Sequence, residues 1–156
     1  MKNLKRMLLP IFAFSVTASS FSQDVFKNKD NVANNGYDLV NYFTANTAER
    51  GSKDHLVSHG GADYYFATAD NAKMFSANPE KFLPQFDGYC SFAMAKMAQK
   101  APVDPKTFRI DDGKLYLFYN DYWEGKPFNT IVPWLNDEKT METMAAKNWT
   151  AMQGKQ

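Results

Sequence analysis

Hydrophobic and polar residues alternate most regularly between Phe108 and Tyr119, and this alternation predicts a β-hairpin. Asp112 and Gly113 stand at its centre, and such a pair favours a two-residue type I′ turn because glycine readily adopts positive φ. The apolar side chains of both strands then share one face, as a sheet packed on helices requires. The register set by this turn pairs Asp111 with Lys114, Ile110 with Leu115, Arg109 with Tyr116, and Phe108 with Leu117.

Two further strands and one ambiguous segment precede this hairpin. Residues 55–59 and 63–66 are rich in β-branched and aromatic residues, and they flank Gly60-Gly61, so we expect two strands around a tight loop. Residues 37–43 are short and aromatic. A strand and a buried helical turn are both compatible with them, and the sequence leaves both alternatives open.

Helical spacing predicts helices in the middle of the chain. Thr68 is a good N-cap for a helix over residues 69–77, and Pro79 suits the first turn of a second short helix. Residues 89–99 carry an apolar stripe at i, i+3, i+4 and i+7, which predicts a helix with one buried face. The stripe consists of Cys90, Ala93, Met94 and Met97.

These elements together predict an α+β fold, a small antiparallel sheet with a hairpin over residues 108–118 packed against several short helices. Residues 23–35 are polar and are expected to form a flexible N-terminal arm. Residues 36–120 form the core, and residues 121–156 a mostly helical extension packed on the same domain. The packing stripe expected in that extension is Met141, Met144, Ala145 and Trp149.

Residues 1–22 have the pattern of a cleavable export signal. Three basic residues and no acidic ones precede an uncharged, mostly apolar run over residues 7–19, which falls short of the ~20 residues of a spanning helix. Small residues at Ser20 and Ser22 permit cleavage before Gln23. The mature protein is therefore expected in the periplasm or the medium, without attachment to the membrane.

Removal of the signal changes the net charge of the chain, and the remaining charges argue against nucleic acid as a partner. The signal holds three of the 18 basic residues and none of the 17 acidic ones, so the mature chain has 15 basic and 17 acidic residues and a formal charge of −2. No basic cluster points to nucleic acid. The 13 Phe, 8 Tyr and 3 Trp are expected mainly to build the core, and in smaller part an exposed groove for a ligand or partner.

Five separated stretches resemble the YHS domain, in the version carried by small exported bacterial proteins. They follow the order of that family across most of residues 36–120. The stretches are GYDLVNYF (36–43), YYFATADNAKMF (64–75), NPEKF (78–82), GYCSFAM (88–94) and DGKLYLFY (112–119). Two positions depart from the family's pattern, because Leu39 stands where proline is usual and Phe118 where asparagine is frequent.

The resemblance implies a fold more clearly than a reaction. In metal-handling members of the family, cysteines stand near the strand–helix step that here holds Ala67 and Asn71. The thiolate pair of a soft-metal site is therefore missing. The resemblance to the exported members of the family does include Cys90, which lies in the sequence Gly-Tyr-Cys that those members share.

Cys90, the only cysteine, is the centre of the candidate metal site. Thiolate and thioether ligands suit Cu(I), and Met94 one helical turn later would lie on the same face as Cys90, with Met97 close by. His55 and His59 are the only histidines, and in a strand they would lie ~13 Å apart, too far to share one metal ion. The competing interpretation is that the sulfur atoms are core fillers.

Three hypotheses follow for function. The first is a non-catalytic exported protein that binds a soft metal ion such as copper through Cys90 and nearby Met or His. The second is a protein-interaction or structural module without metal, in which Cys90 belongs to the core. The third is a cysteine-dependent enzyme, which would need an exposed Cys90 with a histidine base within hydrogen-bond reach.

Overall fold

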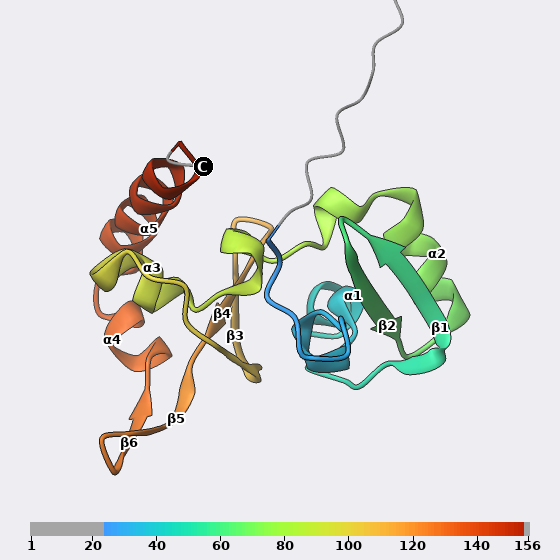
Figure 1. Ribbon diagram of the computed structural model, residues 1–156, viewed down its shortest axis with the longest axis horizontal. Coiled ribbons are helices and arrows are strands. Elements are labelled where there is room, and N and C mark those ends of the chain that lie inside the picture. The colour runs from blue at the N-terminus through green and yellow to red at the C-terminus, as the bar shows by residue number, and fades with distance from the viewer. Residues whose placement is uncertain (1–23, 155–156) are drawn as a thin grey trace, which may run out of the picture.

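The computed structural model describes residues 24–154, which fold into five α-helices and three two-stranded antiparallel sheets (Figure 1). The expected α+β class is confirmed. The α-helices are α1 (Leu39–Thr44), α2 (Ala69–Ala77), α3 (Ser91–Met97), α4 (Ile131–Leu135) and α5 (Glu138–Gln153). The strands are β1 (Ser52–His59), β2 (Ala62–Phe66), β3 (Asp104–Asp111), β4 (Lys114–Phe118), β5 (Asn120–Trp123) and β6 (Lys126–Asn129). Short 3-10 helices lie at η1 (Asn34–Gly36), η2 (Pro79–Lys81) and η3 (Gln85–Gly88).

The expected export signal over residues 1–22 lies outside the described residues. Within residues 24–154, no helix has both the length and the apolar character that crossing a bilayer requires.

Each sheet is a separate hairpin between strands that are neighbours in sequence. The β3–β4 hairpin has the predicted register, including the pairs Phe108–Leu117 and Asp111–Lys114. Asp112 and Gly113 both have positive φ, 46° and 69°, as a type I′ turn requires. The turn residues and the alternation of apolar and polar side chains were therefore sufficient to predict this hairpin.

The predicted strands around Gly60-Gly61 are also confirmed, as β1 and β2. The Thr68 hydroxyl accepts a hydrogen bond from the Asn71 N–H and caps α2 at the expected residue. The ambiguous segment over residues 37–43 is helical. Asp38 caps α1 by accepting a hydrogen bond from the Val40 N–H at 2.8 Å, which explains why the helix begins there.

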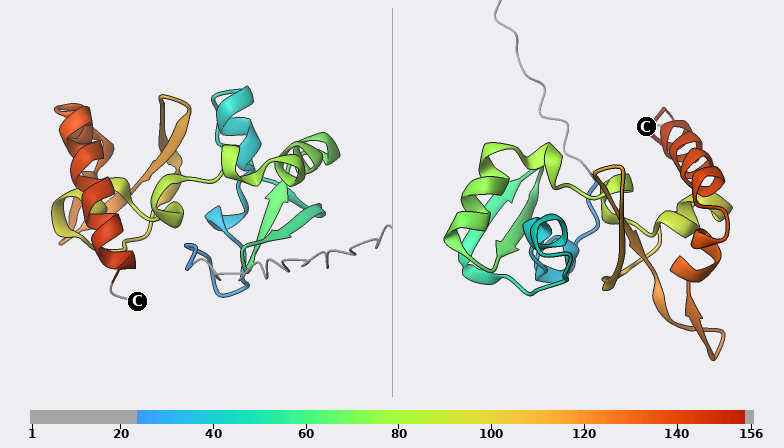
Figure 2. Two further views of the ribbon diagram at one scale, coloured as in Figure 1. Left: turned by 90° about the horizontal axis from the view of Figure 1, so that it is seen from above. Right: turned by 180° about the vertical axis from the view of Figure 1, so that it is seen from behind.

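The core consists of two apolar clusters, and β4 contributes to both. Leu115 and Leu117 pack with α1, α2 and the β1–β2 hairpin, whereas Tyr116 and Phe118 pack around Trp134 with α3 and α5. Successive side chains of a strand point to opposite faces, so the two faces of β4 are both buried. The two halves of the molecule stand on either side of this strand (Figures 1 and 2).

Residues 24–35 do not form the expected arm, which is a correction to the sequence-based prediction. Val25, Val32 and Ala33 are buried in the core. The backbone is held as well, because the Phe26 N–H donates to the Asp87 carbonyl at 2.8 Å. The segment is polar overall, but its three small apolar side chains lie on the inner side of the chain.

The extension over residues 121–156 also differs from the prediction. A hairpin, β5–β6, precedes the two helices and projects from the body of the molecule (Figure 1). Glu124 and Gly125 form its turn with positive φ. The expected stripe of α5 is confirmed, since Met141 and Ala145 are buried and Met144 and Trp149 pack against the same cluster.

Candidate functional site

Cys90 lies immediately before α3 and is fully buried. Its sulfur atom accepts a hydrogen bond from the Tyr119 N–H at 3.4 Å and contacts the Thr130 Oγ1 at 3.5 Å. Its own backbone N–H donates to the Ala101 carbonyl at 3.0 Å. The residue therefore connects the start of α3 to the ends of β4 and β6.

The direction of the Cys90–Thr130 hydrogen bond follows from a third contact. The Thr130 hydroxyl donates its single proton to the Tyr119 carbonyl at 2.9 Å. With that proton engaged, the Thr130 oxygen can accept from the thiol, so the sulfur atom is positioned to donate one hydrogen bond and to accept another. Neither partner carries a positive charge.

A pocket of about 290 Å³ lies beside this thiol, between α3 and the β5–β6 hairpin. We call it the Cys90 pocket. Aromatic side chains from both walls meet there, with Phe92 and Phe128 in edge contact at 6.1 Å between ring centroids. Its lining is formed by Cys90, Phe92, Ala93, Lys96, Met97, Ala101, Pro102, Tyr119, Trp123, Phe128 and Thr130.

The polar side chains of this lining are nearly all engaged inside the protein. The Tyr119 hydroxyl donates to the Tyr122 carbonyl at 2.6 Å, while Cys90 and Thr130 take part in the hydrogen bonds around the thiol. Lys96 is the only charged residue of the lining. The Cys90 pocket is therefore an apolar, aromatic cavity with one lysine residue in its lining.

The two candidate methionines lie in different surroundings. Met94 is fully buried in the cluster around Trp134 and does not line the pocket. Met97, which the apolar stripe placed on the buried face, is 49% exposed, because α3 ends there and Ala98 turns into the left-handed region. Met97 and Cys90 do share the pocket lining, at opposite ends of α3.

The two histidines are far from Cys90. Both belong to β1, on the opposite side of the molecule from α3 (Figures 1 and 2). The His59 ring is in edge contact with Phe75 at 5.9 Å, and its Nε2 lies 3.9 Å from the Glu80 carboxylate. Since β1 is a strand, His55 and His59 lie ~13 Å apart and do not form a ligand pair.

Asn71, at the start of α2, is held by hydrogen bonds to α1. Its side-chain amide donates to the Asp38 carboxylate at 2.7 Å and to the Asn41 side-chain oxygen at 2.9 Å. Asp38 is fully buried and also accepts the Ala67 N–H at 2.8 Å. This end of the fold is therefore a hydrogen-bonded structural network in place of a thiolate site.

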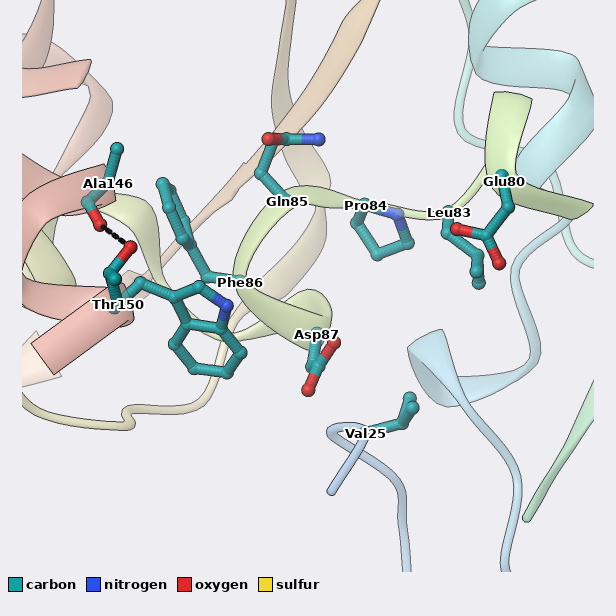
Figure 3. Close-up of a pocket in the computed structure, with 10 residues that line it drawn as sticks. Val25, Glu80, Leu83, Pro84, Gln85, Phe86, Asp87, Ala146 and Thr150 are labelled. Carbon is teal, nitrogen blue, oxygen red and sulfur yellow. Dashed lines mark hydrogen bonds between the residues drawn. The ribbon is translucent and has the colours of Figure 1, made fainter. Parts of the chain in front are cut away.

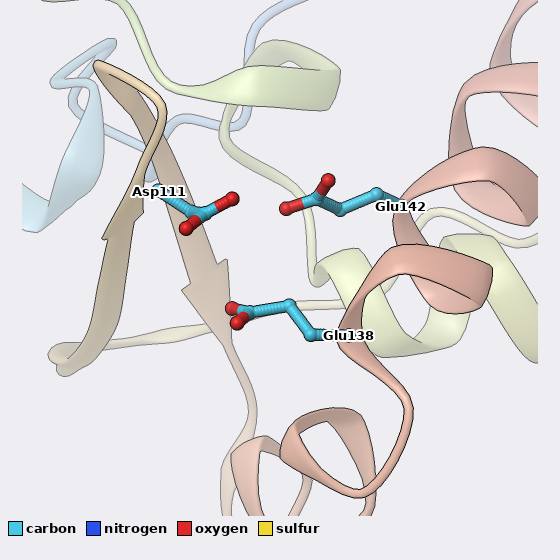
Figure 4. Close-up of side chains that lie close together, drawn as sticks. All are labelled: Asp111, Glu138 and Glu142. Atoms are coloured by element: carbon cyan, nitrogen blue, oxygen red, sulfur yellow. The ribbon is translucent and has the colours of Figure 1, made fainter.

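Three carboxylates converge between the β3–β4 hairpin and α5, namely Asp111, Glu138 and Glu142 (Figure 4). Each of them pairs with one of two cations, Arg109 or Lys139. Arg109 forms a two-point ion pair with Glu138 at 3.0 and 3.2 Å, and Lys139 contacts Asp111 at 2.7 Å and Glu142 at 3.2 Å. The cluster is an ion-pair network that holds α5 on the hairpin.

A second pocket of about 290 Å³ lies between η3 and α5 and is lined by Phe86, Asp87 and Trp149, with Glu80 at its far side (Figure 3). Burial raises the pKa of Asp87, and the nearby Lys100 lowers it in part. Its lining mixes acidic and polar side chains with apolar ones, whereas the lining of the Cys90 pocket is almost wholly apolar. It is therefore a weaker candidate than the Cys90 pocket.

Comparison of the chain with protein-family models, with curated proteins and with solved structures gave no match. The helical spacing placed Cys90 and Met97 on one stripe, and both line the pocket, but the sequence did not reveal the opposite wall of the pocket. Trp123 and Phe128 belong to a hairpin whose Glu124-Gly125 turn was the one available signal.

Proposed function

We propose that this is a non-catalytic, exported binding protein whose ligand enters the Cys90 pocket. The observation that carries the proposal is the lining of that pocket, which is apolar and aromatic except for Lys96. Binding sites for small molecules are typically concave and mostly apolar, with a few polar groups that orient the ligand. The Cys90 pocket has this character.

Exposed aromatic residues at the edge of the pocket support the same proposal. Trp123 is 58% exposed and Tyr122 is 67% exposed, on a hairpin that projects from the body. Exposed apolar residues that lie next to one another often mark a surface that binds a ligand or partner. A ligand in the pocket would cover part of Trp123, which lines it.

The environment of the thiol favours binding over catalysis. A cysteine nucleophile needs a base to take its proton, and both histidines lie in β1 at the other end of the molecule. The thiol proton is donated to Thr130, whose hydroxyl is in turn tied to the Tyr119 carbonyl. The enzyme hypothesis therefore has the least support.

The test is binding of a small neutral apolar fluorophore, 1-methylnaphthalene, to purified residues 23–156. Ala101→Leu adds bulk to the Cys90 pocket, and Ala146→Leu makes the same change in the pocket beside η3. We expect Ala101→Leu to weaken binding at least tenfold and Ala146→Leu to leave it unchanged. No binding by the unmodified protein, or equal binding by the two variants, would overturn the proposal.

A soft metal ion such as copper is the second candidate ligand, because Cys90 and Met97 line one pocket. Coordination would require loss of the thiol proton and of its hydrogen bond to Thr130. The test is Cu(I) competition against a chromophoric chelator under reducing conditions. Binding that is lost in Cys90→Ser and Met97→Leu but kept in Met94→Leu would support this site, and binding unchanged in Cys90→Ser would exclude it.

A further inference from the structure

We infer that the ligand of the Cys90 pocket is a small apolar monocarboxylic acid whose carboxylate pairs with Lys96. The inference rests on the proposed function and specifies the chemical class of its ligand. It follows from three properties of the pocket, namely the polar groups that are already engaged, the single cation, and the volume.

The first property excludes polar ligands such as sugars. Recognition of a hydroxyl-rich molecule needs several free donors and acceptors in the wall, and a ligand group left unpaired on burial weakens binding. The thiol proton of Cys90 goes to Thr130, the Thr130 proton to the Tyr119 carbonyl, and the Tyr119 hydroxyl proton to the Tyr122 carbonyl. These walls leave no hydroxyl or thiol proton free for a ligand.

The second property gives the sign of the ligand's charge. Lys96 is the only ionised group of the lining, and it forms no ion pair with any other residue between 24 and 154. It is exposed on the last turn of α3, so its ammonium can remain in water while its methylene groups border the pocket. A cation placed at the edge of an apolar cavity complements a ligand with one anionic end.

The third property limits the apolar body of the ligand. A closed apolar cavity of ~150 Å³ is large enough for benzene. On that scale, a pocket of about 290 Å³ accommodates roughly ten to twelve carbon atoms. The aromatic pair Phe92 and Phe128 offers ring edges and faces to such a body, which favours an aryl acid over a highly branched one.

The experiment compares two probes of nearly equal shape, 1-naphthylacetate and 1-naphthylacetamide, by calorimetric titration into residues 23–156. An ion pair at a pocket edge contributes modestly, so we expect the carboxylate to bind roughly two- to fivefold more tightly than the amide. Lys96→Met should abolish that preference, because it removes the charge and keeps an unbranched side chain at the same place. Lys147→Met, which removes an exposed lysine of α5 away from the pocket, is the matched control and should keep the preference.

The outcomes separate this inference from the proposed function. Equal binding of both probes by the unmodified protein, or a preference that survives Lys96→Met, would overturn the inference while leaving an apolar binding site in place. Failure of both probes and of the neutral fluorophore to bind would remove the proposed function itself.

Discussion

Asn71 and Asp38 are 33 residues apart in sequence, yet the Asn71 amide donates to the Asp38 carboxylate at 2.7 Å. The same carboxylate caps α1 and accepts the N–H of Ala67. A buried carboxylate is tolerated only when its lone pairs are satisfied in this way. Ala67 and Asn71 thus have a structural role at the place where a soft-metal site would need thiolates.

Asn71→Ala should destabilise the protein. The change leaves one oxygen of the buried Asp38 with a single donor and removes the partner of Asn41, and hydrogen bonds to charged groups contribute about 1.5–3 kcal/mol each. Chemical denaturation should show a loss in this range. Asn78→Ala changes an exposed asparagine just beyond α2 whose side chain caps neither adjoining helix, and it should lose less than about 0.5 kcal/mol. Equal losses in both variants would contradict a special role for Asn71.

The Cys90 thiol should be unreactive toward 5,5′-dithiobis(2-nitrobenzoate) in the folded protein and react fully in denaturant. Its sulfur is buried and hydrogen-bonded as donor and acceptor. Cys90→Ala, which leaves the Tyr119 N–H without its acceptor, should cost about 1–3 kcal/mol of stability. Stoichiometric labelling without denaturant would show that the thiol is accessible and would reopen the hypothesis of a reactive cysteine.

Glu142→Gln should stabilise the protein at neutral pH but not in acid. Burial raises the pKa of Glu142 above its ordinary 4.5, and its Oε1 has no hydrogen-bond partner within residues 24–154. Below pH 4.5 the group is protonated in both the folded and unfolded states, so urea denaturation should give the variant and the unmodified protein equal stability there. Above the raised pKa the folded state holds a poorly solvated carboxylate. The variant should then be more stable by roughly 0.5 kcal/mol, because nearby water screens part of the effect.

Asp111→Asn, in the same cluster, should change the stability of the protein in the opposite direction to Glu142→Gln. The hydrogen bond from Lys139 lowers the pKa of Asp111 below its ordinary 3.8. Its ionised form therefore stabilises the folded state above pH 3.8, and this contribution is lost as the pH falls through the lowered pKa. Urea denaturation between about pH 3 and pH 7 should show Asp111→Asn less stable than the unmodified protein at the upper end. Parallel curves for Asp111→Asn and Glu142→Gln would contradict these assignments.

Val32→Ala should test whether the N-terminal segment belongs to the core. Val32 is buried beside the β1–β2 hairpin, where its neighbour Ala33 donates to the Asp63 carbonyl. Truncation should cost about 1–3 kcal/mol by loss of apolar burial. Val132→Ala makes the same change at a side chain that is 61% exposed and should cost less than about 0.5 kcal/mol. Equal small effects would return residues 24–35 to the status of a mobile arm.

The sequence predicted those elements whose signals are local. Asp112-Gly113 specifies a turn by its own chemistry, and Thr68 caps a helix by accepting the N–H three residues away, so both elements were predicted correctly. The β5–β6 hairpin was missed because Glu124-Gly125 is a weaker turn signal and Pro127 is unusual inside a strand. The burial of Val25 and Val32 was missed because isolated apolar residues in a polar segment have no period.

The candidate site could be predicted only in part for the same reason. Cys90 and Met97 lie at the two ends of one short helix, so their place on the same wall of the pocket follows from helical spacing. The partners that determine the chemistry of the thiol are Tyr119 and Thr130, 29 and 40 residues further along the chain. Tyr119 and Thr130 approach Cys90 only because α3 packs on the end of β4. A local sequence pattern does not predict such a tertiary contact.

The separation of the strands into three hairpins has a consequence for the kinetics of folding. Each strand pairs with its immediate neighbour in the chain, so every sheet can form without a search for a distant segment. Isolated hairpins form in about 1–10 μs. The rate of folding should then be limited by the docking of the two apolar clusters on opposite faces of β4, and substitutions at Leu117 or Phe118 should slow folding more than substitutions in the β5–β6 turn.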